Sequence, residues 1–402
     1  MKIGIIRERK SPPDNRVPLT PRQCHYISEI YTVDFVIEPS PDRCYSDDEY
    51  RREGLCVSGD LSKCEVLMGV KEVPIENLIA DKTYLFFSHT IKKQVYNRPL
   101  LQAILQKNIR MIDYEVLKDV HGARLIAFGH YAGMVGAHNA LWTYGKKTNT
   151  FELTRACESV NYDALKAEYK RTKFPNIKIC LTGNGRVAYG AIEVLDNMGI
   201  REISPSDFLN KTFDEPVFTQ LHARHYVKNK QNLPFVKNEF YNHPERFESN
   251  FEAYTKVSDI FINGIFWNNQ APQFFTLEDM KKEDFSIKVI ADVTCDIAPI
   301  ASVPSTFYAT TIAEPVYGYL PHNQSVTDPF LPDTVDVMSI DNLPNELPRD
   351  ASEFFGKQFI EKVLPELLHY DNSSILEGAT IADDGALTEG YNYLSDYFLE
   401  VI

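Results

Sequence analysis

One stretch near the middle of the chain, residues 177–200 (IKICLTGNGRVAYGAIEVLDNMGI), limits the possible folds more than any other. It contains a G-x-G-x-x-A turn between a strand-like run and a helix-like run. In such a turn the first glycine (Gly183) permits a tight bend, the second (Gly185) lets backbone N–H groups approach a pyrophosphate, and the small Ala188 lets helix and strand pack closely. The stretch therefore predicts a nucleotide-binding βαβ unit. The alternative is a glycine turn that packs and binds nothing.

A nucleotide site of this kind also needs an acidic residue about 20 positions later, which accepts hydrogen bonds from the adenosine ribose. The sequence REISPSDF offers Glu202 and Asp207, and Asp207 is the better placed of the two. It could equally be a solvated loop acid or a helix cap. No arginine follows Asp207 directly, which favours NAD over NADP.

Short apolar, β-branched runs alternate with helix-like segments on both sides of the turn. Before the turn, the predicted strands cover residues 2–6, 33–39, 66–71, 84–88, 110–113 and 125–128. From the turn onward, they begin at residue 177 and continue at 201–204, 259–262, 287–293, 310–313 and 335–340. This alternation is typical of α/β folds with parallel sheets. The glycine turn thus opens a second α/β unit, and the first unit has a role of its own.

The two series of strands predict two Rossmann-like parallel-sheet domains with an inter-domain cleft. Residues 1–133, completed by residues 343–402, are expected to form the substrate domain. Residues 134–342 are expected to form the NAD-binding domain.

Three connecting segments carry further predictions. Residues 213–257 exceed a minimal crossover and are interpreted as an insertion with some structure of its own. Residues 131–147 are expected to contain a long, closely packed helix. Another helix is expected near Asp350, because Asp350 and Glu353 have capping-box spacing and an apolar stripe follows them.

Composition limits the possible partners. The chain has 402 residues and a formal net charge of -14, which disfavours nucleic acid and anionic membranes but permits an anionic small substrate beside local cations. The seven cysteines form no C-x-x-C pair and lie beside no histidine cluster, so neither a metal site nor a disulfide framework is expected. The sequence shows no signal-peptide pattern and no apolar run of membrane-spanning length, so a cytoplasmic protein is expected.

Several motifs, in order along nearly the whole chain, resemble one enzyme family. They are DNRVPLTP (14–21), GVKEVP (69–74), FFSHTIKKQ (86–94), IDYE (112–115), RLIAFGHYAG (124–133), the glycine turn, ADVTCD (291–296) and SIDNLPNELPRDASEFF (339–355). Together they look like the NAD-dependent, lysine-forming saccharopine dehydrogenases, within the superfamily of alanine dehydrogenase and the nicotinamide nucleotide transhydrogenase. The AFG-x-YAG and NLP-x-x-LPR-x-ASEFF segments resemble the saccharopine branch more particularly.

The resemblance implies roles for individual residues. Lys71 and His89 would be the acid/base pair. The substrate would be held by two carboxylate-binding arginines and their neighbours, namely Arg16, Arg124, Gln94, Phe128, Thr294, Cys295 and Asp296. The cofactor would contact Gly183, Gly185, Arg186, Asp207, Ile340, Asp341, Asn342 and Leu343. The acids that the family places around the pocket would be Asp14, Glu72 and Glu115.

These residue types suit the implied chemistry. Oxidation of a secondary amine by hydride transfer needs a base for the N–H proton, and hydrolysis of the imine needs a group that activates water. A lysine can serve if burial beside cations lowers its pKa, although Glu72 would oppose that shift. Arginines can clamp carboxylates through two hydrogen bonds. Taken singly, Lys71 and Arg16 would more often be surface charges, and His89 a satisfied histidine at a strand end.

The chain departs from the family pattern at three places. Ala123 stands where the family tends to carry an arginine near the cofactor, so that contact is in question. His130 stands where an apolar residue is expected and would change the pocket. Residues 213–257 are longer than expected, and the open alternatives are that they cover the cofactor, change specificity or mediate assembly.

The predicted function is reversible oxidative cleavage of saccharopine to lysine and 2-oxoglutarate with NAD. One alternative is a related amino-acid or opine-type dehydrogenase; an alanine dehydrogenase-like enzyme fits less well, because its small substrate would not need so many carboxylate binders. The other is a catalytically silent NAD-sensing protein, against which the joint presence of Lys71, His89, Arg16 and Arg124 argues.

Overall fold

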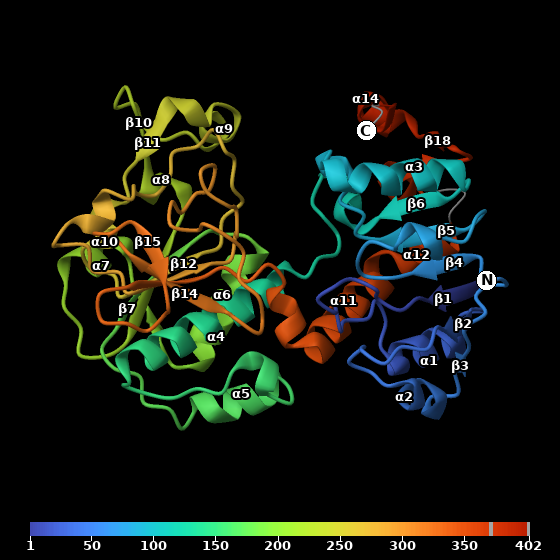
Figure 1. Cartoon of the computed structure of the whole chain (residues 1–402), viewed down its shortest axis with the longest axis horizontal. Coiled ribbons are helices and arrows are strands. Elements are labelled where there is room, and N and C mark those ends of the chain that lie inside the picture. The colour runs from blue at the N-terminus through green and yellow to red at the C-terminus, as the bar shows by residue number, and fades with distance from the viewer. Residues whose placement is uncertain (370–372, 400–402) are drawn as a thin grey trace. The chain divides into compact units, whose positions relative to one another are not determined.

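The computed structural model describes residues 1–369 and 373–399 (Figure 1). The chain divides into two compact units: unit 1 contains Met1–Phe128 and Pro348–Ile402, and unit 2 contains Gly129–Leu347. The sequence placed these boundaries at residues 133 and 343. They lie elsewhere because helix α4 (Gly129–Thr148) already begins at Gly129, and the 3₁₀ turn η8 (Leu343–Glu346) packs on α4.

Unit 1 is built on a mostly parallel eight-stranded sheet with the order β18-β17-β6-β5-β4-β1-β2-β3. Strands β1 to β6 run parallel, and β17 and β18 are antiparallel. Their bounds are β1 Lys2–Ile5, β2 Asp34–Ile37, β3 Cys56–Val57, β4 Val66–Met68, β5 Thr83–Phe86, β6 Arg110–Asp113, β17 Thr380–Asp383 and β18 Ala386–Leu387. The central strands are continuous apolar runs, as expected where both faces of a parallel sheet are covered.

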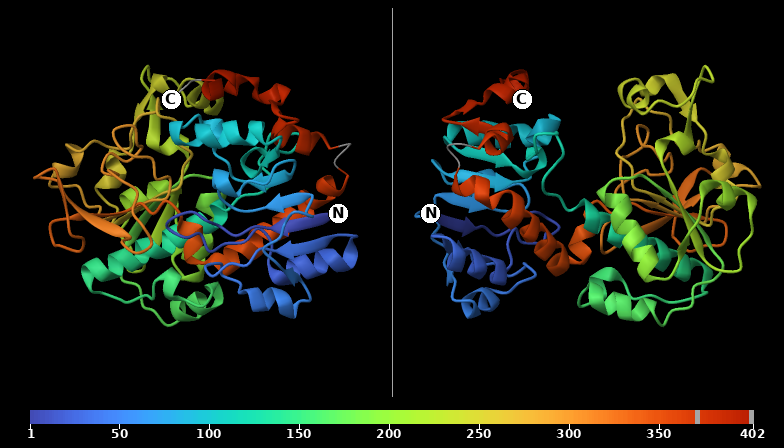
Figure 2. Two further views of the ribbon diagram at one scale, coloured as in Figure 1. Left: turned by 45° about the vertical axis from the view of Figure 1, so that its right-hand side comes forward. Right: turned by 180° about the vertical axis from the view of Figure 1, so that it is seen from behind.

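The C-terminal segment completes unit 1, as the sequence predicts. Strand β17 pairs with β6, and the red C-terminal helix α14 lies beside the turquoise α3 (Figure 2). The backbone N–H of Val17 donates to Ser352 Oγ over 2.9 Å. The helices of this unit are α1 Pro21–Ile30, α2 Asp47–Arg52, α3 Arg98–Gln106, α11 Pro348–Lys362, α12 Leu364–Leu368, α13 Ser374–Ala379 and α14 Ser395–Leu399. Since α11 begins at Pro348, Asp350 lies inside its first turn and is not the predicted cap.

Unit 2 contains a second mostly parallel eight-stranded sheet with the order β15-β14-β16-β13-β12-β7-β9-β8. Only β14 and β15 run antiparallel to their neighbours. The bounds are β7 Lys178–Thr182, β8 Arg201–Glu202, β9 Val217–Leu221, β12 Ile260–Asn263, β13 Val289–Asp292, β14 Val316–Leu320, β15 Ser325–Thr327 and β16 Val335–Met338. The α/β fold class with two such sheets is therefore confirmed.

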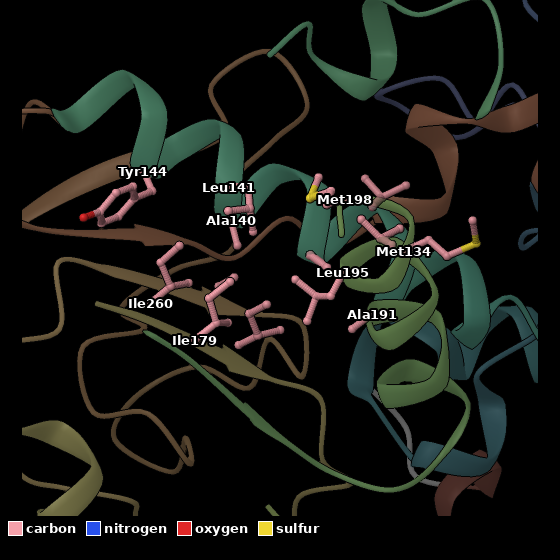
Figure 3. Packing of buried hydrophobic residues seen from close by; sticks show 14 of the residues in the cluster. Met134, Ala140, Leu141, Tyr144, Ile179, Ala191, Leu195, Met198 and Ile260 are labelled. Atoms are coloured by element: carbon pink, nitrogen blue, oxygen red, sulfur yellow. The ribbon is translucent and has the colours of Figure 1, made fainter. Parts of the chain in front are cut away.

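Helices α4 and α6 (Arg186–Asn197) cross closely and cover one face of this sheet (Figure 3). A Cβ atom on Gly190 would lie 1.9 Å from the carbonyl oxygen of His130, and one on Gly133 would lie 1.7 Å from that of Val187. Apolar side chains of the two helices, among them Leu141 and Leu195, pack on β7 and β12. The other helices of unit 2 are α5 Tyr162–Tyr169, α7 Pro205–Asn210, α8 Ala223–Tyr226, α9 Lys237–Asn242 and α10 Glu252–Thr255.

Two predicted strands are wrong, and the predicted insertion is wrong in part. Residues 125–128 form no strand, because the chain there makes a bridge at Arg124 and then turns into α4. Residues 310–313 form only an isolated bridge between Thr310 and Ile340. Residues 213–257 are not wholly an insertion, since they begin with the sheet strand β9; after it, β10 (Val227–Asn229) and β11 (Phe247–Ser249) form a separate two-stranded sheet.

No helix within the described residues is long and apolar enough to span a membrane.

Candidate functional site

The carboxyl ends of β1, β4 and β5 carry the polar residues that the sequence singles out in unit 1. Strand β4 lies between β1 and β5 in the sheet. Arg16 follows β1, Lys71 follows β4 and His89 follows β5. Ligands of parallel α/β sheets gather at this edge. The structure thus brings Lys71 and His89 to the ends of adjacent strands.

His89 is oriented by a carboxylate. Its Nδ1 lies 2.5 Å from Oε1 of Glu72, and both side chains are less than one-fifth exposed. Burial raises the pKa of Glu72, but the hydrogen bond and charge of His89 outweigh it, so the pKa is lowered overall. A proton on Nδ1 that is donated to Glu72 leaves Nε2 as the ring nitrogen without that hydrogen bond. Residue His89 is also held in a left-handed backbone conformation, with φ of 53°.

Lys71 is only partly exposed and lies among charges of both signs. Burial lowers its pKa, and the cations Arg16 and Lys10 lower it further, whereas Asp14 and Glu72 oppose the shift. A lysine with a lowered pKa loses its proton more readily near neutral pH and can act as a base.

Arg16 is buried and held by a neighbouring acid. Its side chain is 3% exposed, and Nε and Nη2 donate to the two carboxylate oxygens of Asp14 over 2.9 and 2.6 Å. Its guanidinium carbon lies 4.2 Å from the ring centroid of Phe128. Two-point contact and stacking fix the orientation of the guanidinium in a way that a lysine could not reproduce.

A cluster of packed rings supports both arginines of unit 1. Arg124 lies 5.4 Å above the ring of Phe87, while Arg16 lies above Phe128. Both rings contact Phe355, at centroid distances of 6.1 and 4.4 Å, and Tyr114 packs against Phe87 and Phe355. We call Phe87, Tyr114, Phe128 and Phe355 the aromatic platform. It gives the two guanidiniums one common, rigid base.

Of two further residues in the predicted set, Glu115 lies near Arg124 and Gln94 is bonded elsewhere. Glu115 Oε1 lies 4.0 Å from Arg124 Nη1 and 3.6 Å from Lys92 Nζ. Gln94 is exposed, and its Oε1 accepts a hydrogen bond from Tyr96. Among the described residues, no hydrogen bond or ion pair joins the Gln94 side chain to Lys71 or His89.

The glycine turn of unit 2 has the geometry of a dinucleotide cradle. Gly183 has φ of 112°, and a Cβ there would lie 2.5 Å from the carbonyl oxygen of Gly264, so only glycine fits. Gly185 precedes α6 as its N-cap without a side-chain cap, and a Cβ there would meet nothing within 4 Å. The backbone N–H groups that start α6 therefore suit a pyrophosphate. These residues fit the pyrophosphate of a dinucleotide such as NAD.

The other predicted contacts of unit 2 lie at the same edge of the sheet. Thr294, Cys295 and Asp296 follow β13, and Ile340, Asp341, Asn342 and Leu343 follow β16. Thr294 Oγ1 donates to the carbonyl of Ile265, which follows β12, and Cys295 Sγ donates to that of Ser339 at the end of β16. The structure thus brings both segments and the glycine turn to the carboxyl ends of β7, β12, β13 and β16.

Asp207 lies in a different position from the one the sequence suggests. It is in α7, where its carboxylate forms an ion pair with Lys211 at 2.9 Å. Strand β7 lies between β12 and β9, and β8 lies beyond β9 at the edge of the sheet. The residues after β9 are His222 and Arg224, and Gln220 Nε2 donates to the carbonyl of Gly183 over 2.8 Å. Sequence reasoning missed them because it assigned residues 213–257 to an insertion, although the run VFTQL has a strand pattern.

The two single-residue departures from the family pattern have local explanations. Ala123 lies in a tight turn, where its N–H donates to Asp119 Oδ1. His130 is in α4, and its Nε2 lies 2.9 Å from Glu193 Oε2 on α6, so it joins these two helices. Throughout residues 1–369 and 373–399, no group of three or more His, Cys, Asp or Glu side chains could hold a metal ion.

The fold is an α/β arrangement of two units, each with its candidate site at the carboxyl ends of a mostly parallel sheet. Residues 4–135 match the family model described as "Alanine dehydrogenase/PNT, N-terminal domain". Among solved structures, an L-alanine dehydrogenase is similar with a TM-score of 0.66 at 15% identity, covering 99% of this chain and 100% of that one. A transhydrogenase from Sinorhizobium meliloti has a TM-score of 0.62 at 14% identity, over 96% of this chain and all of that one. These likenesses concern the fold alone.

Sequence relatives are more particular. The mitochondrial alpha-aminoadipic semialdehyde synthase of Rattus norvegicus is 30% identical over 98% of this chain and 47% of its own length. A saccharopine dehydrogenase [NAD(+), L-lysine-forming] of Neurospora crassa is 27% identical over 92% of each chain. The chain thus spans about half the length of the synthases and nearly all of the fungal dehydrogenases. The predicted resemblance to lysine-forming saccharopine dehydrogenases is confirmed.

Proposed function

We propose that the chain catalyses the reversible, NAD-dependent cleavage of saccharopine and water to lysine and 2-oxoglutarate. The observation that carries this proposal is the joint placement, in unit 1, of Lys71 and the His89–Glu72 pair at adjacent strand ends. The similarity to lysine-forming saccharopine dehydrogenases supports it. Unit 2 would bind the dinucleotide through the glycine turn.

The two buried or stacked arginines account for the substrate class. Saccharopine carries several carboxylates, and a guanidinium binds a carboxylate through two parallel hydrogen bonds. The aromatic platform holds Arg16 and Arg124 in fixed orientations, so they bind without losing much side-chain freedom. A substrate with a single carboxylate would leave one of these sites unused.

Proton transfer falls to Lys71 and His89. NAD held at the glycine turn would supply the hydride acceptor for the carbon beside the secondary amine. Lys71 takes the amine proton, because its lowered pKa makes it a base. His89 Nε2, oriented by Glu72, then takes a proton from the water that adds to the imine and returns it to the leaving lysine amine. The balance is one saccharopine, one water and NAD giving lysine, 2-oxoglutarate, NADH and a proton.

The test is a spectrophotometric assay in the reductive direction. Purified protein receives NADH with lysine and 2-oxoglutarate, and the near-ultraviolet absorbance of NADH is followed. We expect it to fall with saturation in both substrates. Parallel assays use pyruvate with ammonia, and other amine and keto-acid pairs. A clear preference for pyruvate and ammonia would overturn the substrate, and NADH binding without turnover of any pair would overturn the enzymatic function.

A further inference from the structure

Glu8 holds the backbone on which Lys71 stands. It lies in the loop after β1, and its carboxylate reaches the end of the neighbouring strand β4. Oε1 accepts a hydrogen bond from the N–H of Val70 over 2.6 Å, and Oε2 accepts one from the N–H of Lys71 over 2.9 Å. One side chain thus binds two successive backbone groups at the candidate base.

The Glu8 carboxylate takes over where the backbone pairing between β1 and β4 ends. The last backbone bond between these two strand ends runs from Ile6 N–H to the carbonyl of Met68. Beyond it, the N–H groups of Val70 and Lys71 need other partners, because buried backbone donors are costly to leave unpaired. A Cβ on Gly69 would lie 3.3 Å from Glu8 Oε1 and 2.9 Å from Ile6 Cδ1, so glycine permits the approach.

The surroundings make this acid costly to keep. Burial raises the pKa of Glu8 to about 8, and the charge of Asp14 adds to the effect; the two backbone N–H groups and Arg16 oppose it. The buried hydroxyl of Tyr114, on the aromatic platform, has its own pKa raised by burial and then by Glu8. Only the ionised carboxylate accepts both hydrogen bonds well, and with a pKa of about 8 this form dominates above about pH 8.

We propose that Glu8 is a positioning residue for Lys71. By fixing the N–H groups of Val70 and Lys71, it sets the direction in which the Lys71 side chain leaves the end of β4. The inference rests on the proposed function, in which Lys71 is the base. It assigns Glu8 no contact with the substrate.

The test compares Glu8→Gln with a matched control, Glu38→Gln. Glu38 follows β2 in the same sheet and also accepts a hydrogen bond from a backbone N–H, that of Arg7, over 2.9 Å. A glutamine at position 8 can accept through only one atom and presents an NH₂ group to the other donor. Above about pH 8, where Glu8 is ionised, we expect kcat to fall at least about tenfold in Glu8→Gln, because small displacements of a catalytic group are costly. The affinity for NADH and the thermal midpoint near pH 8 should stay close to wild type in Glu8→Gln. Glu38→Gln should keep wild-type turnover, although it also weakens the ion pair between Glu38 and Arg9.

A second measurement does not depend on turnover. An amine-reactive reagent labels Lys71, and peptide mass spectrometry follows the rate of labelling against pH. We expect the midpoint for Lys71 to move in Glu8→Gln and to stay in place in Glu38→Gln. An unchanged midpoint, or equal losses of turnover and thermal stability in both variants, would overturn the inference. If the wild type turns over no substrate, the proposed function fails, while the labelling still decides the role of Glu8.

Discussion

Lys71 is a residue that the fold tolerates at a cost. Burial and the nearby Arg16 lower its pKa from the ordinary value of 10.5. A lowered pKa means that the charged ammonium form is less favourable in the folded chain than in the unfolded chain. The charged form of Lys71 therefore lowers the free energy of unfolding. Stability alone would favour an apolar side chain at this position.

Substitution of Lys71 should therefore separate activity from stability. We expect Lys71→Met to lower kcat by about 10² to 10⁴, with an unchanged affinity for NADH and a free energy of unfolding no lower than that of wild type. His89→Gln should lose turnover likewise, whereas Lys63→Met, at an exposed position, should change neither property. Steady-state kinetics and urea unfolding make the comparison. Wild-type turnover in both active-site variants would remove the acid/base assignment.

A buried histidine in α4 should make stability depend on pH. Burial lowers the pKa of His138 to about 4 from 6.5, and its ring bonds to the Tyr169 hydroxyl and the Thr154 carbonyl at 2.8 Å each. As the pH falls through 6.5 toward 4, the unfolded chain gains a proton that the folded chain refuses, so stability falls in that window. His138→Gln should remove up to about 3 kcal/mol of this dependence. Urea unfolding near neutral pH and at about pH 4.5 measures it, and equal slopes in variant and wild type would refute the prediction.

Sequence motifs can identify side chains but not what holds them. Lys71, His89, Arg16 and Arg124 were found because their motifs resemble a known family. The contact of Glu8 with the Val70 N–H could not be predicted from the sequence, because it joins the loops after two different strands. No residue spacing within either loop indicates it. The aromatic platform escaped for the same reason, since Phe355 lies more than two hundred residues from Phe128.

At the scale of elements, the crossing of α4 and α6 depends on glycine. Gly190→Ala would place a methyl group against the carbonyl of His130. We expect a loss of about 1–3 kcal/mol or more, as in overpacked cores, measured by urea unfolding.

The control for this crossing is Gly378→Ala in α13. A Cβ there meets nothing within 4 Å, so the substitution should be neutral or stabilise by up to about 1 kcal/mol. If Gly190→Ala proved as stable as this control, the helices could not be in such close contact.

The position of β9 bears on nucleotide specificity. The strand beside β7 usually ends near the adenosine ribose, and β9 ends in His222 and Arg224, with no carboxylate to repel a 2′-phosphate. We therefore expect weak discrimination, with KM for NADPH within about tenfold of that for NADH.

Two variants locate the ribose. Arg224→Glu should raise KM for NADPH by about tenfold or more while leaving NADH unaffected. Asp207→Asn should change neither KM value, because Asp207 pairs with Lys211 in α7. Weaker NADH binding in Asp207→Asn would instead support the ribose contact that the sequence suggested.

Strands were predictable where short apolar runs alternate regularly with helix-like segments. Strand β6 has the predicted bounds, and β1 differs by one residue. Strand β9 was hidden, because the aromatic and basic residues after it made the whole segment look irregular. The order of the strands in the sheet could not be predicted from the sequence pattern. It depends on which strand pairs with β7, and this differs from the order along the chain.

At the scale of the whole molecule, unit 2 is one continuous segment with its own core. Its buried clusters draw only on residues 129–347. We expect a fragment of these residues to fold and to bind NADH, measured by circular dichroism and NADH fluorescence. The same fragment with Gly185→Glu, which places a negative charge at the start of α6, should fold without binding. Failure of the unaltered fragment to fold would contradict the independence of unit 2.

Unit 1 is discontinuous, and this has a consequence for synthesis. During synthesis, residues 129–347 are made before the segment that supplies β17 and α11. Until then the edge of β6 lacks its partner strand, and the rings of Phe87 and Phe128 lack Phe355. A nascent chain that stalls in this interval exposes an unpaired strand edge and apolar rings, which favour aggregation. Premature termination upstream of residue 348 should therefore yield a product that chaperones retain or proteases remove.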